Sequence, residues 1–368
     1  MMQLPMGFHE KVSFQLRSLY EGFGYSQYKM NKFEEYDLYA QNKDFLMSDS
    51  AITFLDTNGK LMALKPDVTL SIVKNSRDDL STLQKLYYHE NVYRVSQNTH
   101  SFRELLQVGL ECIGSIDDYC ICEVLTLAAK SLGEISSSAI LSISHLGLLS
   151  TLMDAIGLPE GSKQQMLSCI GSKNIHEMTA LCKACGTKEE FIGILSQAAS
   201  LCGAPKEVLP KLIALLDGIT DTTPLVQLLR ITVALEEIGL SEILRFDLSA
   251  VDDIRYYNGI VFKGFVQGLP SAVLSGGQYD HLMRRMHRKS GAIGFAVYMD
   301  SLERLDNSAS QFDVDSLILY GPATPLALIQ KETARCQAAG ESVTVQQSVP
   351  ENLRYRNLIN LTQWEVAP

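Results

Sequence analysis

The sequence predicts an α+β fold: a mostly antiparallel sheet, built from two separated halves of the chain and flanked by helices. Three observations support this prediction. Strand-like and helical runs alternate over residues 1–157, helical periodicity alone follows, and strand-like runs then return. With 368 residues, of which 46% are hydrophobic, the chain is long enough for about two or three domains and one substantial core.

Residues 1–157 are expected to form the first half of the core. A helical pattern opens this segment over residues 9–24, and two extended runs then meet at Asn58-Gly59, the strongest short signal for a β-hairpin. The remaining expected elements are a strand pair over residues 85–95 and 102–114, a helix over 117–135, a strand over 138–145 and a helix over 146–158.

The rest of the chain divides into three parts. Residues 158–240 carry only helical periodicity, interrupted by Gly and Pro, and predict an all-helical insertion. Residues 241–310 are expected to be the second half of the core. Its expected elements are strands over 243–251, 258–266 and 270–280, and a strand that runs into a helix over 291–305. Residues 311–368 read strand–helix–strand over 316–348 and then lose their pattern, which predicts a truncated α/β tail.

Charge and hydropathy exclude several classes of protein. The formal net charge is −10 and no run of Lys or Arg occurs, so the chain lacks the broad basic field that supplies most non-specific affinity for nucleic acid. No apolar segment is long enough to span a bilayer. The opening residues do not place an apolar region after a positively charged one, as a signal peptide would. We therefore expect a cytoplasmic protein with no membrane association.

The eight cysteines do not indicate a metal site. Cys120–Cys122 and Cys182–Cys185 lie in helical patterns, and neither pair has a second set of ligands at the short spacing that zinc needs. We expect buried, small apolar side chains in a reducing compartment, with no metal and no cofactor.

The stretch SAVDDIRYYNGIVFKGF, residues 249–265, allows two interpretations. Asp252-Asp253 after an apolar run is how a phosphoribosyl-diphosphate loop begins, whereas the tyrosine pair before Asn258-Gly259 looks like a wall of an amino-acid pocket. A diphosphate loop needs small and glycine residues whose backbone N–H groups surround the phosphate. This chain supplies bulky residues at those positions: Ile254, Arg255, Tyr256 and Tyr257. The second interpretation is therefore favoured.

Five segments carry a family resemblance that extends from Met1 to about Leu305. They are LKPDVT, VYR followed by FRELLQVGLE, RYYNGIVF, SGGQYD and GAIGFAVYMDSL. In this order and rough spacing they resemble histidyl-tRNA synthetase, and still more its non-synthetase paralogue, the regulatory subunit of the short-form ATP phosphoribosyltransferase. The resemblance implies a sheet and helices like those of class II aminoacyl-tRNA synthetases.

The same resemblance implies that adenylation has been lost. That reaction needs fixed cations at the phosphates of ATP and a carboxylate-held metal. The arginine of the family's histidine-specific motif falls on Asp252. Motif 2 keeps Arg94 but has Ser96 at its acidic position, and the Glu-Arg pair of motif 3 falls on Asp300 and Ser301. We expect no catalytic residues of its own in this chain.

The amino-acid pocket of the family is matched more closely. Its amine-binding acid falls on Asp67, with Thr69 nearby, and the residues that contact the amine and the imidazole fall on Gln107 and Glu111. Positions four apart on a strand share a face, so the last two side chains are expected to point the same way.

The remaining pocket candidates are a pair of tyrosines, two arginines and a pair of glycines. Tyr256 and Tyr257 match the tyrosine wall, Arg94 and Arg255 are the candidates for a carboxylate, and Gly276-Gly277 would let a backbone approach closely. Structural alternatives stay open for most of these positions. Asp67 could be a turn residue, Glu111 a strand-end carboxylate, Arg94 a salt-bridged arginine, one tyrosine a core residue, and the glycine pair a bulge.

The resemblance implies a non-catalytic regulatory subunit of ATP phosphoribosyltransferase, in the first step of histidine biosynthesis. Its expected partners are the short catalytic subunit, whose activity it supports, and histidine as the feedback effector. A homodimer within a hetero-oligomer is expected, with no tRNA bound. Two alternatives remain: a divergent histidyl-tRNA synthetase, and a stand-alone histidine-binding protein.

Overall fold

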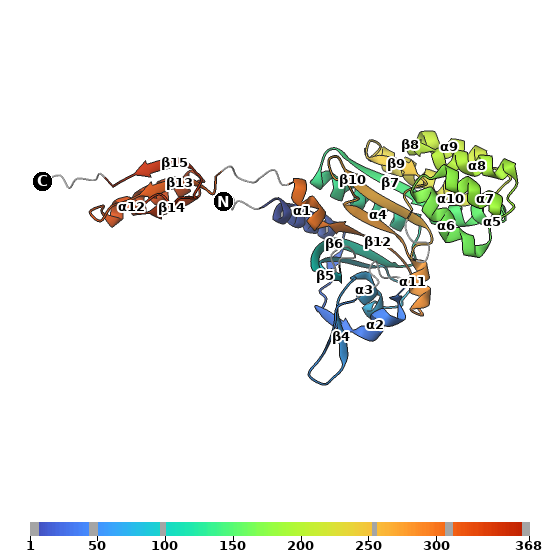
Figure 1. Cartoon of the computed structure of the whole chain (residues 1–368), viewed down its shortest axis with the longest axis horizontal. Helices are drawn as coiled ribbons and strands as arrows, with labels where there is room; N and C mark the ends of the chain where they lie inside the picture. Colours follow the sequence, from blue (N-terminus) through green and yellow to red (C-terminus); the bar gives the residue numbers. More distant parts are fainter. Residues whose placement is uncertain (1–6, 44–50, 96–100, 252–255, 306–311, 363–368) are drawn as a thin grey trace. The chain divides into compact units, whose positions relative to one another are not determined.

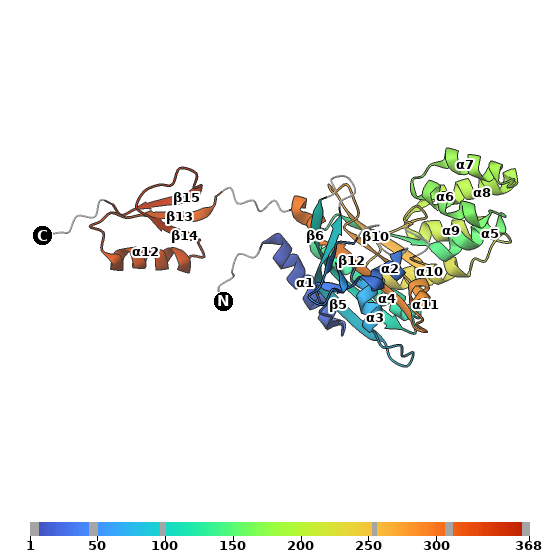
Figure 2. The same ribbon diagram turned by 60° about the horizontal axis from the view of Figure 1, so that its bottom comes forward.

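The computed structural model describes residues 7–43, 51–95, 101–251, 256–305 and 312–362. These residues fall into two compact units. One comprises Val12–Arg304 and holds the main sheet, and the other contains the C-terminal segment that starts at Leu305. Figures 1 and 2 show both units from two directions.

A nine-stranded sheet forms the centre of the larger unit, in the order β1-β5-β6-β12-β11-β10-β7-β9-β8. Only the pairs β1·β5 and β7·β9 are parallel. The strands are β1 (Ser26–Gln27), β5 (Gln84–Val95), β6 (Phe102–Gly114), β7 (Ala139–His145), β8 (Cys202–Gly203), β9 (Leu244–Asp247), β10 (Ile260–Val266), β11 (Leu274–Gln278) and β12 (Gly291–Tyr298).

The two halves of the chain are joined within this sheet. Strand β12, from the second half, pairs along β6 of the first half, and β10 pairs along β7. The expectation of one mostly antiparallel sheet made from two separated segments is confirmed. The sheet therefore cannot form before both segments on either side of the helical insertion are present.

Long helices cover one face of this sheet. Helix α4 (Asp118–Ile135) packs against β7, β10 and β12, and the Asp117 side chain caps it by accepting a hydrogen bond from the Cys120 amide at 2.9 Å. A Cβ atom at Gly264 of β10 would lie 2.6 Å from Leu132 of α4, so glycine allows this close approach. Tyr20 of α1 (Phe8–Gly22) packs edge-on against Phe295 of β12, at a ring separation of 6.0 Å.

A small second sheet contains the predicted hairpin. Its order is β2-β4-β3, with β2 (Phe33–Glu35), β3 (Thr53–Leu55) and β4 (Leu61–Leu64). The turn at Asn58-Gly59 is confirmed: Gly59 has a φ of +78°, and the Asp56 carboxylate accepts from the Asn58 and Lys60 amides. Two helices that the sequence did not predict follow strands of this sheet along the chain. They are α2 (Tyr36–Gln41), after β2, and α3 (Thr69–Asn75), after β4.

The five helices expected over residues 158–240 all form, and they follow α5 (Leu146–Ala155). They are α6 (Glu160–Gly171), α7 (Ile175–Ala184), α8 (Glu189–Ser200), α9 (Pro205–Leu216) and α10 (Thr223–Glu237). Helix α10 packs against α4 and α9, which connects this insertion to the helical face of the main sheet.

The smaller unit corrects one prediction. It holds β13 (Val314–Leu319), α12 (Leu326–Ala338), β14 (Val343–Gln346) and β15 (Tyr355–Asn360), in a parallel sheet of order β14-β13-β15. The expectation that the pattern ends after residue 348 is wrong, because residues 355–360 form β15. Two asparagines weaken the strand signal there, and pairing with the central strand β13 decides the conformation.

A second correction concerns the end of the larger unit. The helix expected after β12 is the 3₁₀ helix η2 (Met299–Leu305), and α11 (Asp280–Arg285) lies between β11 and β12. Short 3₁₀ segments of this kind commonly connect regular elements.

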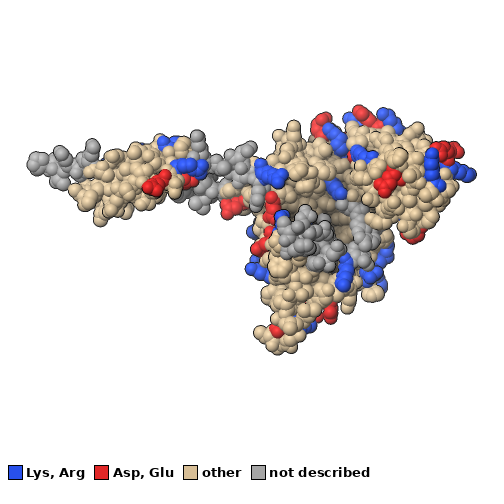
Figure 3. Space-filling model, viewed as in Figure 1, with Lys and Arg blue, Asp and Glu red and all other residues tan. Residues whose placement is uncertain are grey.

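Membrane helices and metal sites are absent from the described residues. None of their helices is long and apolar enough to cross a membrane, and none of their His, Cys, Asp and Glu side chains gather in a group of three or more that could hold a metal ion. All eight cysteines are free, and five of them are buried. On the face drawn in Figure 3, basic and acidic side chains are interspersed.

Candidate functional site

The predicted polar residues lie on the face of the main sheet opposite to α4. In the strand register, Glu111 of β6 lies beside Gly294 of β12, which lies beside Gly277 of β11. Gln107, four residues before Glu111, pairs with Tyr298 and shares this face, as expected from strand alternation. Both polar side chains are buried, at 4% and 2% exposure for Gln107 and Glu111.

Two glycines make room for side chains that lie flat on this face. A Cβ atom at Gly294 would fall 1.8 Å from Oε2 of Glu111, and one at Gly277 would fall 2.7 Å from Cδ1 of Tyr257. Any other residue would therefore displace Glu111 or Tyr257. The close approach at Gly277 is that of the Tyr257 ring to the sheet backbone.

Glu111 is held by two hydroxyl donors. Oγ1 of Thr69 donates to Oε1 at 2.8 Å, and the hydroxyl of Tyr279 donates to Oε2 at 2.6 Å. Burial raises the pKa of Glu111 to about 8, against the two hydrogen bonds, and the nearby Asp67 charge raises it further. Most Glu111 side chains are therefore protonated at pH 7, and each oxygen keeps a further lone pair for a ligand.

Asp67 and Arg94 lie together at the start of α3. Oδ1 of Asp67 accepts from the Leu70 amide at 2.9 Å, so this residue has the turn role that was its structural alternative. Burial raises the pKa of Asp67, although the Leu70 amide and the Arg94 charge oppose the change. Nε of Arg94 donates to the Pro66 carbonyl at 3.1 Å, while its Nη2 is buried and has no hydrogen-bond partner among the described residues.

Tyrosine rings enclose the site. Tyr256 and Tyr257 are both half-buried, with their ring centroids 4.6 Å apart, and Tyr256 also lies 5.8 Å from Tyr279. The ring of Tyr88 lies over the backbone of Gly109. A Cβ atom at Gly109 would be 2.5 Å from Cζ of that ring. Burial raises the pKa of Tyr88 and of Tyr279, and the Glu111 charge adds to both effects.

Sequence reasoning missed Tyr88 and Tyr279. Tyr279 follows the last residue of β11, so strand alternation could not show which way it points, and Tyr88 is visible as a site residue only through its cross-strand pairing with Gly109. The sequence alone does not show which residues of two strands pair with each other, and this register was the information that was missing.

Several predicted positions fall outside the described residues, namely Ser96, Asp252, Asp253, Ile254 and Arg255. Of the motif 3 positions, Asp300 and Ser301 lie in η2, and Oδ1 of Asp300 accepts from the Leu106 amide of β6 at 3.3 Å.

The arrangement combines a buried guanidinium donor, two buried carboxyl groups and an aromatic wall. A small zwitterion with a ring would be complementary to it, because a carboxylate can accept from Arg94 while an ammonium and ring N–H groups donate to Asp67 and Glu111.

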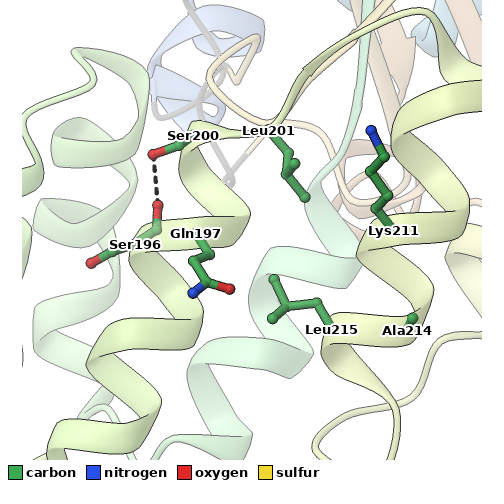
Figure 4. Close-up of a pocket in the computed structure, with 7 residues that line it drawn as sticks. All are labelled: Ser196, Gln197, Ser200, Leu201, Lys211, Ala214 and Leu215. Atoms are coloured by element: carbon green, nitrogen blue, oxygen red, sulfur yellow. Dashed lines mark hydrogen bonds between the residues drawn. The ribbon is translucent and has the colours of Figure 1, made fainter.

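A hollow lies away from this site, in the helical insertion between α8 and α9 (Figure 4). Its lining residues are Ser196, Gln197, Ser200, Leu201, Lys211, Ala214 and Leu215. The Ser200 hydroxyl is turned inward along its own helix, donating to the Ser196 carbonyl at 2.8 Å. With one cation and no carboxyl group in its lining, this hollow has none of the complementary charges of the site on the sheet.

Several known proteins are similar to this chain over most of its length. The ATP phosphoribosyltransferase regulatory subunit of Oceanobacillus iheyensis is 26% identical over 314 residues, covering 84% of this chain and 77% of the relative. The protein of the same name from Clostridium kluyveri is 29% identical over 317 residues, covering 83% and 81%.

Solved structures share the fold. An ATP phosphoribosyltransferase regulatory subunit/histidyl-tRNA synthetase from Bacillus halodurans has a TM-score of 0.79 at 25% identity, covering 98% of both chains. A chain of the ATP phosphoribosyl transferase (HisG:HisZ) complex from Thermotoga maritima has a TM-score of 0.62 at 20% identity, covering 80% of this chain and 98% of that one, and it supports the fold alone. The expected resemblance and fold class are confirmed.

The family model that matches is histidyl-tRNA synthetase, over residues 6–302. This range includes both halves of the main sheet and every site residue described above, and we conclude that the chain belongs to the histidyl-tRNA synthetase family.

Proposed function

We propose that this chain is a regulatory subunit of ATP phosphoribosyltransferase, which acts in the first step of histidine biosynthesis. It would bind a short catalytic subunit, raise its activity and transmit inhibition by histidine. The names of its relatives support this function, and the site on the sheet supports histidine as the effector. A regulatory subunit can act only if its ligands bind two states of the complex with different affinity.

The observation that carries the effector assignment is the unpartnered Nη2 of Arg94. A buried donor without an acceptor is costly, typically by about 1–3 kcal/mol, unless a ligand supplies one. A ligand carboxylate there would place its ammonium group near Asp67, whose charge is already close to Arg94. The imidazole would then lie among Gln107, Glu111 and the tyrosine wall of Tyr256 and Tyr257.

We further propose that the chain has no adenylation activity. The acid of motif 2 and the Glu-Arg pair of motif 3 are represented by Ser96, Asp300 and Ser301. Loss of one preorganised charge at a reacting centre commonly costs about a hundredfold in rate, and several are replaced here.

The deciding experiment mixes the chain with a short catalytic subunit and measures phosphoribosyl transfer with and without histidine. We expect a higher rate on mixing and a lower rate when histidine is added. A catalytic subunit whose rate is the same with and without this chain would refute the proposal. Histidine-dependent exchange between ATP and pyrophosphate would instead identify a working synthetase.

Matched variants connect the response to the site. Glu111→Gln is expected to weaken inhibition by histidine at least about tenfold, since it replaces a carboxyl oxygen that can accept from the ligand with an amide N–H donor. Glu104→Gln is the control, because Glu104 lies on the same strand, also accepts from two side chains, and is exposed. Equal responses of the two variants would place the effector elsewhere.

A further inference from the structure

The Asp280 carboxylate helps to fasten the segment that carries the tyrosine wall to the sheet. Nδ2 of Asn258 donates to Oδ2 of Asp280 at 3.2 Å, and the Asp280 amide donates back to Oδ1 of Asn258 at 2.8 Å. Nε2 of Gln278 donates to the same Oδ2 at 2.8 Å, and the Ala292 amide donates to Oδ1 at 3.0 Å. Asp280 thus joins the end of β11, the start of β12 and the residue after Tyr257.

Close backbone packing reinforces this junction. The Asn258 amide donates to the Gln278 carbonyl at 3.0 Å, and a Cβ atom at Gly259 would lie 2.2 Å from Oε1 of Gln278. The ring of Tyr257 packs against the backbone of Gly277, the residue before Gln278. The wall therefore has little freedom to move away from the sheet while the Asn258–Asp280 pair is intact.

The neighbouring residue gives Asp280 a second influence on the site. Tyr279, which donates to Glu111, lies next to Asp280 and is fixed by its own amide, which donates to the Ala292 carbonyl at 2.9 Å. One junction therefore sets the position of both the tyrosine wall and a donor to Glu111.

We propose that Asp280 is a positioning residue, whose carboxylate holds the tyrosine wall against the sheet and thereby sets the affinity of the site for its amino-acid ligand. The part concerning the ligand rests on the proposed function; the part concerning the wall does not. Asp280 contacts no ligand in this role and acts through Asn258 and Tyr279.

The test uses a substitution and its compensation. Asp280→Asn places an amide donor opposite two other donors, the side-chain amides of Asn258 and Gln278, and breaks the junction. When Asn258→Asp is added, the side-chain amide at position 280 can donate to the carboxylate at position 258. The hydrogen bond between the two side chains is then restored in the opposite direction. Asp78→Ala is the control, since Asp78 accepts from the Lys289 and Ser290 amides and the Ser290 hydroxyl, close to the start of β12 and away from the wall.

Two measurements on the full chain are compared after urea unfolding has shown that each variant is folded. Hydrogen exchange of residues 256–260 is expected to be faster in Asp280→Asn, restored in the double variant and unchanged in Asp78→Ala. The histidine dissociation constant, from calorimetry, is expected to rise about tenfold or more in Asp280→Asn and to return close to wild type in the double variant.

The outcomes separate the two proposals. If Asp280→Asn leaves both measurements at the wild-type values, or if Asp78→Ala changes them equally, the positioning role is refuted. If the wild type binds no histidine while hydrogen exchange follows the expected pattern, the role of Asp280 on the wall is supported and the proposed function fails.

Discussion

Glu111 offers the sharpest quantitative test of the site. Burial raises its pKa from 4.5 to about 8, and at 2% exposure solvent screens it little. A carboxyl whose pKa is raised by folding stabilises the fold fully below the unfolded-state pKa, and this contribution is lost as the pH rises through the folded-state pKa. A pKa difference of this size corresponds to about 5 kcal/mol in the free energy of unfolding.

The perturbation is Glu111→Gln, which cannot ionise and can still meet the Thr69 and Tyr279 hydroxyls, because hydroxyls both donate and accept. The free energy of unfolding is measured by urea titration from about pH 4 to about pH 9 without histidine. We expect the wild type to lose several kcal/mol relative to Glu111→Gln between pH 4.5 and 8.

Subtracting the two curves removes every titrating group that does not interact with Glu111, and the electrostatic coupling between Asp67 and Glu111 stays in the difference. Glu104→Gln, on the exposed part of the same strand, should follow the wild type. Parallel curves for the wild type and Glu111→Gln would refute the reasoning, because they would mean that Glu111 has the same pKa in the folded and unfolded chains.

Three further predictions use other residues. The buried His145 caps α5 by accepting through Nδ1, and burial lowers its pKa to about 4. Protonation of His145 should therefore cost about 3 kcal/mol of stability as the pH drops from 6.5 to 4, and this cost should appear in urea titrations as the difference between the wild type and His145→Asn, which keeps an acceptor. Gly277→Ala should displace Tyr257 and lower the unfolding midpoint and the histidine affinity together, whereas Gly133→Ala, with open space around it, should do neither. Arg94→Ala should raise the histidine dissociation constant at least about tenfold in calorimetry, since it removes the donor at Nη2; it should also lower the free energy of unfolding by about 1 kcal/mol or more, since Nε loses its bond to the Pro66 carbonyl, and an unchanged dissociation constant would contradict the assigned role.

Much of the fold could be predicted because local signals agreed with the final structure. Asn58-Gly59 is a strong local hairpin signal, and it lies in the loop that joins β3 to β4, where Gly59 has a positive φ and Asn58 does not. The helical insertion was visible because Gly and Pro separate runs of apolar residues at helical spacing. Strand β15 was missed because its asparagines hide the alternation, and its pairing partner β13 lies about 40 residues earlier in the chain.

The candidate site could be predicted in part for the same reason. Gln107 and Glu111 were placed on one face by alternation alone, and Asp67 and Arg94 by resemblance. The hydroxyls of Tyr279 and Thr69 on Glu111, and the bare backbone of Gly294 beneath it, depend on contacts between segments up to 183 residues apart. No local pattern reports such contacts.

The sequence by itself determined most of the order of helices and strands, the family and the identity of the polar residues available to a ligand. Tertiary structure decided which of those residues meet, because pairing β6 with β12 brings the two halves of the chain together on one face of the sheet. It also decided their charge state, since burial raises the pKa of Glu111 and Asp67 only once that face is enclosed.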